Sequence, residues 1–380
     1  MTTALTHARV LTAHGWRDDL AVLLDGPRIA ALLPHDHAAV RVAQAQDDLH
    51  GALLVPGFID TQVNGGGGAL FNAAPTVATI RAIGAAHRRF GTTGFLPTLI
   101  SDSVDKMRAA LAAVEQAFDA GVPGLLGIHL EGPYLAPERK GVHDPKWFHV
   151  PGEEELAMLC APHRGVRLLT LAPERVPHAA IARLAATGVI VNAGHTAADH
   201  ATVRAALAAG VRGFTHLFNA MTPLGSREPG VVGAALDDPG SWCGIIVDGH
   251  HVHPASLRSA IAAKPRGKTL LVTDAMPPVG AADPSYVLNG ETIIVKDGIC
   301  QTADGVLAGS ALDMATAVRN SVDMLGLPLD EAVRMASTYP ADFLGLGVTH
   351  GRIAVGYRAD LVAMDDGCNV QRSWIGGQPS

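Results

Sequence analysis

The 380-residue sequence is poor in cysteine, in aromatic residues and in charge. Its four cysteines lie far apart and form no C-x-x-C pair, which argues against a disulfide framework and against a cysteine-rich zinc site. The net charge of −7 leaves no dominant basic face, so nucleic acid is not expected as a partner. An anionic small molecule remains compatible with this charge, because it needs only one or two local cations.

Long apolar runs are also missing. Stretches such as LLGIHL and GIIV are far too short to span a bilayer, so no membrane segment is expected. The first twenty residues carry neither a basic leader nor a sustained apolar stretch, so no signal peptide is expected. Together with the scattered cysteines, these features predict a cytoplasmic protein. The hydrophobic content of 48% against 17% charged residues is the balance of a well-packed enzyme.

Short apolar runs recur from residue 53 onwards, and an Ala-rich segment of helical character follows many of them. The eight runs are LVPGFID, TTGFLPTLI, LLGIHLEG, RLLTLAPE, VIVNAGHT, GFTHLFNA, CGIIVDGHH and TLLVTDAM. Eight strand–helix repeats predict an α/β fold, a (β/α)8 TIM barrel, whose catalytic groups gather at the C-terminal ends of the strands.

The two ends of the chain have a different pattern, with short β elements separated by turn residues. We expect residues 1–53 and 349–380 to form the two parts of one small β domain, and residues 54–348 to form the barrel. Turn signals at Asn289-Gly290 and Asp297-Gly298 predict a β-ribbon insertion at about residues 285–308.

Polar residues stand at the ends of the predicted strands. They are Asp60, Glu131, His195, His216, His250, His251 and Asp274. Two histidines and one carboxylate, with a water completing the shell, are typical of a catalytic zinc site, which indicates Glu131, His195 and His216 as ligands. Each residue alone could equally be a hydrogen-bonded core or surface residue, but three at equivalent strand ends favour the metal.

Three further residues suit a hydrolytic site. Asp274, in LLVTDAM, could act as general base beside a metal-bound water, or else be a structural helix-capping aspartate. His143, in KGVHDP, could polarise a carbonyl, or else be a solvated loop histidine. Arg227 lies in a Gly/Pro-rich loop and suits a phosphate or carboxylate, although a lone loop arginine is often simply solvated.

Taken together, these stretches resemble the amidohydrolase superfamily and, within it, the N-acetylglucosamine-6-phosphate deacetylases. The resemblance spans essentially the whole chain in the family's order. HLEGPYL and THLFNAM are specific to these deacetylases, whereas GRIAVGYRADLV is shared more widely. The resemblance implies a β-sandwich built from both termini beside the barrel, and hydrolysis of an acetamide to an amino sugar phosphate and acetate.

The resemblance also implies roles for single residues. Glu131, His195 and His216 would bind one divalent metal ion per subunit, with zinc expected. Asp274 would be the catalytic acid/base, His143 would help to polarise the carbonyl, and Arg227 with His251 would hold the 6-phosphate. The implied substrate-binding residues are Gln62, Asn64, Val142, His143, Asn219, Ala220, Arg227, Asp248, His251, Leu307, Ala308 and Gly309. The expected partners are a phosphorylated amino sugar and a second copy of the chain in a homodimer, with no nucleic acid and no membrane.

The stretch DTQVNGGGG shows one departure from many superfamily members. Where they carry a His-x-His pair at the end of strand one, this chain has Gln62 and Asn64. Amides are poor ligands for a transition metal but good hydrogen-bonding groups, so we expect one metal ion, with the amides orienting substrate or water. The glycines that follow precede no Gly-Lys-Ser/Thr, so they indicate close backbone packing rather than a phosphate cradle.

Alternatives remain open at this point. The N-acetylgalactosamine 6-phosphate isomer differs by one inverted hydroxyl, and a cyclic amide would suit another amidohydrolase. A non-catalytic barrel used for assembly is a third alternative, which the complete set of Glu131, His195, His216 and Asp274 disfavours.

Overall fold

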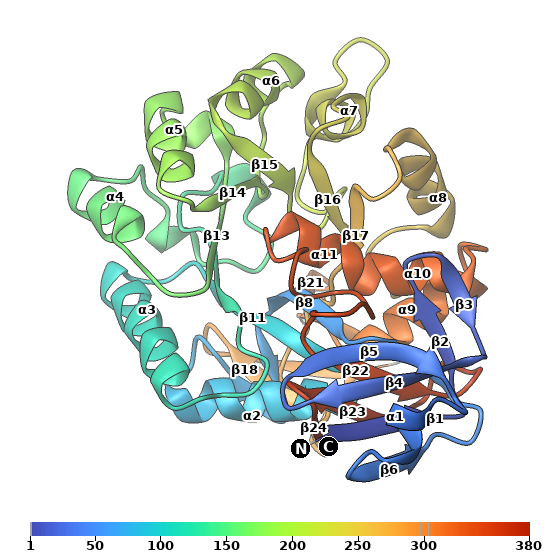
Figure 1. The fold of residues 1–380 in the computed structure, drawn as a ribbon. Coiled ribbons are helices and arrows are strands. Elements are labelled where there is room, and N and C mark those ends of the chain that lie inside the picture. Colours follow the sequence, from blue (N-terminus) through green and yellow to red (C-terminus); the bar gives the residue numbers. More distant parts are fainter. Residues whose placement is uncertain (1, 297, 303) are drawn as a thin grey trace. The chain divides into compact units, whose positions relative to one another are not determined.

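The computed structural model describes residues 2–296, 298–302 and 304–380 (Figure 1). Its chain forms two compact units. The first comprises Met1–Asp60, His87–Gly94 and Asp313–Ser380, and the second comprises Thr61–Ala86 and Phe95–Leu312. The three-part division expected from the sequence stays a prediction.

Eight strands form one sheet in the order β17-β16-β15-β14-β13-β12-β11-β8. Their bounds are β8 (Phe58–Val63), β11 (Thr92–Ile100), β12 (Gly127–Glu131), β13 (Val166–Leu171), β14 (Ile190–Ala193), β15 (Val211–Phe214), β16 (Trp242–Ile245) and β17 (Thr269–Leu271). Neighbours from β11 to β17 pair in parallel. The sheet closes on itself, because Val63 bridges Ala275 in parallel and the Asp274 N–H donates to the Gln62 carbonyl at 3.0 Å. The predicted (β/α)8 barrel is confirmed.

Helices connect the strands. They are α2 (Val77–Arg88), α3 (Val104–Asp119), α4 (Glu153–Cys160), α5 (His178–Ala186), α6 (His200–Ala209), α7 (Gly230–Asp237) and α8 (Pro254–Ala263). Figure 1 shows α3 to α8 outside the barrel strands. The side chains of Ser103 and Asp199 cap the first turns of α3 and α6, and Gly210, with φ +122°, caps the C-terminus of α6. The strands read as continuous apolar runs because helices cover one face while the barrel interior buries the other. Shorter elements are β9 (Gly65–Gly66), β10 (Ala69–Leu70), η1 (Pro137–Arg139), η2 (Pro145–Trp147) and η3 (Pro173–Arg175).

A four-stranded antiparallel ribbon follows β17. It consists of β18 (Ser285–Leu288), β19 (Glu291–Lys296), β20 (Ile299–Gln301) and β21 (Leu307–Ser310). Asn289 and Gly290 both have positive φ at the first turn, as a tight hairpin requires. Asp297, in the second predicted turn, lies outside the described residues. Tyr286, Ile293 and Cys300 pack with Ile100 and Met276, so the ribbon is anchored on the barrel through an apolar cluster.

The first unit contains two β-sheets, ordered β5-β4-β1-β6 and β24-β23-β22-β7-β2-β3. Their strands are β1 (Thr2–Thr6), β2 (Arg9–Thr12), β3 (Gly15–Arg17), β4 (Leu20–Asp25), β5 (Arg28–Pro34), β6 (Ala45–Asp48), β7 (Leu53–Pro56), β22 (Leu361–Met364), β23 (Val370–Ile375) and β24 (Gln378–Pro379). Leu5 and Val22 of one sheet share a buried core with Val10, Leu361 and Trp374 of the other. Both ends of the chain therefore build one small sandwich. The helices of this unit are α1 (Ala38–Arg41), α9 (Met314–Asp323), α10 (Leu329–Ala336) and α11 (Thr338–Phe343).

Within the described ranges, no helix combines the length and the apolar character needed to cross a membrane.

Candidate metal centre and active site

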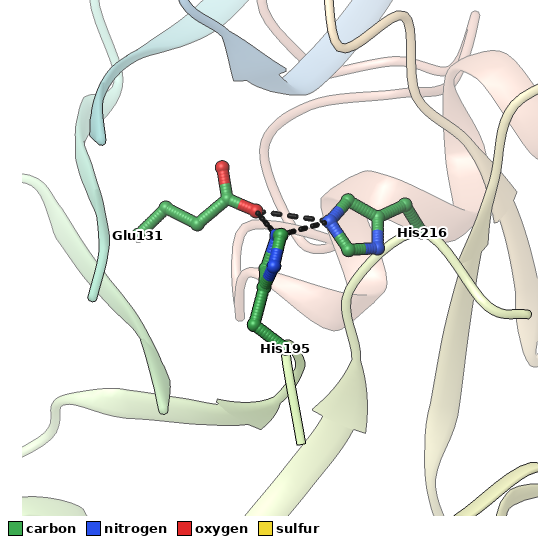
Figure 2. Close-up of side chains that lie close together, drawn as sticks. All are labelled: Glu131, His195 and His216. Atoms are coloured by element: carbon green, nitrogen blue, oxygen red, sulfur yellow. Dashed lines mark hydrogen bonds and ion pairs between the residues drawn. The ribbon is translucent and has the colours of Figure 1, made fainter. Parts of the chain in front are cut away.

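Glu131, His195 and His216 meet at the C-terminal ends of three barrel strands (Figure 2). Glu131 is the last residue of β12, while the histidines follow β14 and β15. The Nε2 atoms of His195 and His216 lie 3.2 and 3.0 Å from Oε1 of Glu131, and 3.1 Å from each other. All three side chains are buried. Three potential ligand atoms therefore converge on one point.

This arrangement fits a divalent metal ion. Zinc lies about 2.0–2.2 Å from nitrogen and oxygen ligands, so two ligands of one ion are separated by roughly 3–3.5 Å, as observed here. Nδ1 of His195 lies 2.8 Å from the Arg139 carbonyl, which can only accept a hydrogen bond. The His195 proton is therefore on Nδ1 in the neutral ring, and Nε2 presents its lone pair to the site.

Backbone strain concentrates at this centre. His195, His216 and Asp274 adopt φ values of +48°, +36° and +53°, in a region that residues other than glycine rarely occupy. Such conformations persist only where surrounding structure enforces them, and they cluster at functional sites. Here the strand ends turn sharply, which points these side chains over the barrel mouth.

The charges of the centre are strongly coupled. Burial raises the pKa of the Glu131 carboxyl, but the His195 and His216 imidazoles outweigh this and hold that pKa well below its usual value. Burial lowers the pKa of His216, and contact with Glu131 outweighs it, so the pKa of His216 is raised. A negative carboxylate suits a cation, and binding of the cation would displace the proton that Glu131 favours on His216.

Asp274 stands beside this trio and is held by two amides. Its Oδ1 accepts hydrogen bonds from Asn64 Nδ2 at 2.7 Å and from Gln62 Nε2 at 3.1 Å. Burial, followed by the nearby charge of Glu131, raises the pKa of Asp274 to about 6. Its other oxygen, Oδ2, receives no hydrogen bond from the described residues. A carboxylate with one free oxygen and a pKa near neutrality suits proton transfer.

His143 presents a donor to the same space. Its Nδ1 accepts the backbone N–H of Ser101 at 3.2 Å, so the proton of the neutral ring is on Nε2. Burial, and then the neighbouring His195, lower the pKa of His143 well below its usual value. The ring is therefore a neutral donor, as polarisation of a carbonyl oxygen requires.

A cavity of about 340 Å³ lies over these groups. The predicted site residues that line it are Asn64, Glu131, Val142, His143, His195, His216, Asn219, Ala220, His251, Asp274, Leu307 and Gly309. Gln62, Arg227, Asp248 and Ala308 are not among its described lining residues. Gln62 donates hydrogen bonds to both carboxylates, Ala308 is fully buried, and Arg227 is exposed. The roles assigned to all these residues stay predictions.

Asp248 is paired with His251, which is among the described residues that line the cavity. Its Oδ2 lies 2.6 Å from Nδ1 of His251, and its Oδ1 accepts the His251 backbone N–H at 2.9 Å. Burial raises the pKa of Asp248, but these hydrogen bonds outweigh it and lower that pKa to about 2. The carboxylate thus orients the imidazole so that Nε2 faces outward from the pair. The adjacent His250 is exposed.

Sequence reasoning missed two residues and misplaced one. Ser101 follows β11 and orients His143, and the strand-end rule could have identified it. Arg139 lines the cavity and binds His195 through its carbonyl, for which the sequence carries no signal because backbone carbonyls are common to all residues. Asp60 lies inside β8 rather than at its end, because the strand continues to Val63.

Comparison with known proteins identifies the family. The model of the Amidohydrolase family matches residues 53–379. The chain belongs to the amidohydrolase family. An N-acetylgalactosamine-6-phosphate deacetylase of Shewanella sp. (strain ANA-3) is 44% identical, covering 98% of this chain and 94% of that protein. An N-acetylglucosamine-6-phosphate deacetylase of Haemophilus influenzae is 34% identical, covering 100% and 99%.

A solved structure agrees in fold. The crystal structure of N-acetylglucosamine-6-phosphate deacetylase from Pasteurella multocida superimposes with a TM-score of 0.96, at 36% identity and with 100% of both chains covered. The family resemblance that the motifs indicated is therefore confirmed, and so is the hydrolase class. A buried Glu131–His195–His216 group in this family indicates a divalent metal ion.

Proposed function

We propose that this amidohydrolase removes the acetyl group of an N-acetylhexosamine 6-phosphate, with N-acetyl-D-glucosamine 6-phosphate as the first candidate. The products would be glucosamine 6-phosphate and acetate. The observation that carries the proposal is the convergence of Glu131, His195, His216, Asp274 and His143 on one cavity. The names of the full-length relatives support the choice of substrate.

The proposed metal site uses Glu131, His195 and His216 to hold one divalent ion, for which zinc is the first candidate. Such an ion polarises an amide carbonyl and lowers the pKa of a nearby water. Glu131 contributes one oxygen, Oε1, because Gln62 donates to its Oε2 at 3.2 Å. The two histidines contribute neutral Nε2 atoms.

Asp274 would move the proton. Its free Oδ2 takes a proton as the oxygen of water bonds to the acetamide carbon. The same oxygen then returns that proton to the nitrogen as the carbon–nitrogen bond breaks, which releases an amine and acetate. Without that proton the nitrogen is a poor leaving group, and the tetrahedral intermediate would return to substrate.

His143 would stabilise the negative charge that develops on the carbonyl oxygen. Its Nε2–H is fixed as a donor by the hydrogen bond from Ser101 to Nδ1. A donor that is already oriented needs no rearrangement in the transition state, and this is the main contribution of such groups.

The 6-phosphate would be held by His251 and Arg227. His251 lines the cavity with Asp248 behind it. Arg227 lies on the exposed loop that precedes α7. Val142, Asn219, Ala220 and Leu307 to Gly309 would contact the sugar. Arg139 is among the residues that line the cavity and gives a comparison for Arg227.

N-acetylgalactosamine 6-phosphate is the second candidate substrate. The observation that favours it is the 44% identity to a protein of that name, against 34% for the Haemophilus influenzae protein named for the gluco isomer. The two sugars share the acetamide and the phosphate, so the chemistry proposed above applies to both. Contacts to the single inverted hydroxyl would decide between them.

We further propose that the protein is cytoplasmic, which agrees with the scattered cysteines, and that it forms a homodimer. Size-exclusion chromatography with light scattering would test the dimer.

The function is tested with purified protein and four sugars. N-acetylglucosamine, N-acetylgalactosamine and their 6-phosphates are supplied, and release of acetate is measured. The proposal expects turnover of at least one phosphorylated sugar, loss of turnover on chelation, and recovery with about one equivalent of zinc. Absence of acetate release from all four sugars by metal-loaded protein would refute it.

A further inference from the structure

The two amides at the end of β8 contact both carboxylates of the active site. Gln62 lies in β8 and Asn64 directly follows its last residue, Val63, and the side chains of both reach Oδ1 of Asp274. The Asn64 Nδ2 donates to Asp274 Oδ1 at 2.7 Å. The Gln62 Nε2 donates to that same oxygen at 3.1 Å and to Glu131 Oε2 at 3.2 Å.

The chemistry of these contacts fixes their direction. An ionised carboxylate only accepts hydrogen bonds, so each amide must present its nitrogen to it. The amide nitrogen of Gln62 carries two hydrogens, and one can be given to each carboxylate. Gln62 and Asn64 are both buried, so water does not compete for these donors.

We propose that Gln62 and Asn64 are positioning residues that select which oxygen of each carboxylate reacts. Two donors on Oδ1 of Asp274 leave Oδ2 as the oxygen that exchanges a proton. One donor on Oε2 of Glu131 leaves Oε1 directed at the Nε2 atoms of His195 and His216. This inference rests on the proposed function for its kinetic part, whereas its metal-binding part does not.

The backbone makes this role separable from folding. The closure of the barrel at this point uses main-chain groups, since Asp274 N–H donates to the Gln62 carbonyl and Asn64 N–H donates to the Ala275 carbonyl at 2.9 Å. The Asp274 carbonyl also accepts the Ser310 N–H at 2.9 Å. Side-chain substitutions at positions 62 and 64 leave these bonds available.

The two residues differ in one contact, so substitutions at the two positions should change kcat and metal affinity differently. Among the described residues, the Asn64 side chain donates only to Asp274, so Asn64→Leu should lower kcat by about 10- to 100-fold, with metal affinity and KM nearly unchanged. Gln62 reaches Glu131 as well, so Gln62→Met should lower kcat and also weaken metal affinity by about 10- to 100-fold. Metal affinity is measured on the metal-free protein by competition with a zinc-binding dye.

A matched control is Asn192→Leu. Asn192 is a buried amide on β14, and its nitrogen donates to the Thr215 hydroxyl rather than to either carboxylate. It should leave metal affinity and kcat within about threefold of the wild type. If Asn64→Leu does not fold, Asn64→Ala removes the donor with less apolar bulk.

A double-mutant cycle separates positioning from general destabilisation. In an Asp274→Ala background, Asn64→Leu should lower kcat by less than about threefold, because the carboxylate that Asn64 contacts is already absent. The inference would be overturned if Asn64→Leu still lowered kcat by about 10- to 100-fold in the Asp274→Ala background. It would also be overturned if Gln62→Met bound metal as tightly as Asn192→Leu does. A wild type that binds zinc but hydrolyses no sugar would contradict the proposed function alone, and the zinc titration of Gln62→Met would still decide the Glu131 contact.

Discussion

The backbone N–H of Ser101 donates to Nδ1 of His143, and the Ser101 hydroxyl lies 2.8 Å from the same nitrogen. A backbone N–H cannot accept a hydrogen bond, so the neutral imidazole has its proton on Nε2. No described residue forms a hydrogen bond with that nitrogen. The tautomer of a cavity-lining histidine is thus determined by a residue at the end of the preceding barrel strand.

The first prediction concerns this donor. His143→Leu should lower kcat by about 100- to 1000-fold, the usual cost of one lost oxyanion donor. His143→Gln should lose less, since its amide can still donate. Steady-state kinetics at full metal loading measures both, with His250→Gln as an exposed histidine control. Equal activity of the leucine variant and the wild type would remove His143 from the mechanism.

Asp274 gives the second prediction. Asp274→Asn keeps the size of the side chain but cannot take up the proton, so kcat should fall by at least about 100-fold. Bound metal should remain at about one equivalent per chain, measured by atomic emission. A metal-loaded variant with near-normal turnover would show that another group moves the proton.

The third prediction separates phosphate binding from sugar binding. A charge-assisted hydrogen bond contributes about 1.5–3 kcal/mol, so Arg227→Ala should reduce kcat/KM for the phosphorylated sugar by roughly 10- to 150-fold. The unphosphorylated sugar should be affected far less. Because Arg139 is an arginine among the residues that line the cavity, Arg139→Ala is measured beside it. Equal losses on both sugars would mean that Arg227 acts structurally.

The fourth prediction uses the Asp248–His251 pair. The pKa of Asp248 is lowered to about 2, so its contribution to stability is present above its unfolded value near 4 and is lost as pH falls from about 4 to about 2. The size of that contribution is on the order of 2 kcal/mol. Urea unfolding at several pH values should show a lower free energy of unfolding for Asp248→Asn than for the wild type at pH 6. This difference in free energy should disappear near pH 2. A gap independent of pH would contradict this pairing.

The fifth prediction concerns metal stoichiometry. Gln62 and Asn64 bind carboxylates through their nitrogens, so metal analysis should find about one divalent ion per chain. The double variant Gln62→His, Asn64→His should gain capacity for a second ion. A crystal structure with two ions, one of them touching Gln62 or Asn64, would refute the single-metal site.

Much of the site could be predicted from the sequence because it lies at strand ends. Parallel strands of a barrel finish at one rim, so residues such as Glu131, His195 and Asp274 converge although they are far apart along the chain. Periodicity could not reveal orientation. The expectation that Gln62 and Asn64 orient substrate or water stays a prediction, and the structure adds that their nitrogens bind Asp274 and Glu131.

The sequence by itself determined the barrel, the sandwich built from both termini and the family, because these depend on repeating patterns of burial along single strands and helices. Only the tertiary structure decided the tautomers of His143 and His195, the exposure of Arg227 and the free oxygen of Asp274. Each of these depends on one contact between residues of different strands or loops. Hydrogen bonds act over about 3 Å, and a chain sequence contains no distances between such residues until the barrel closes.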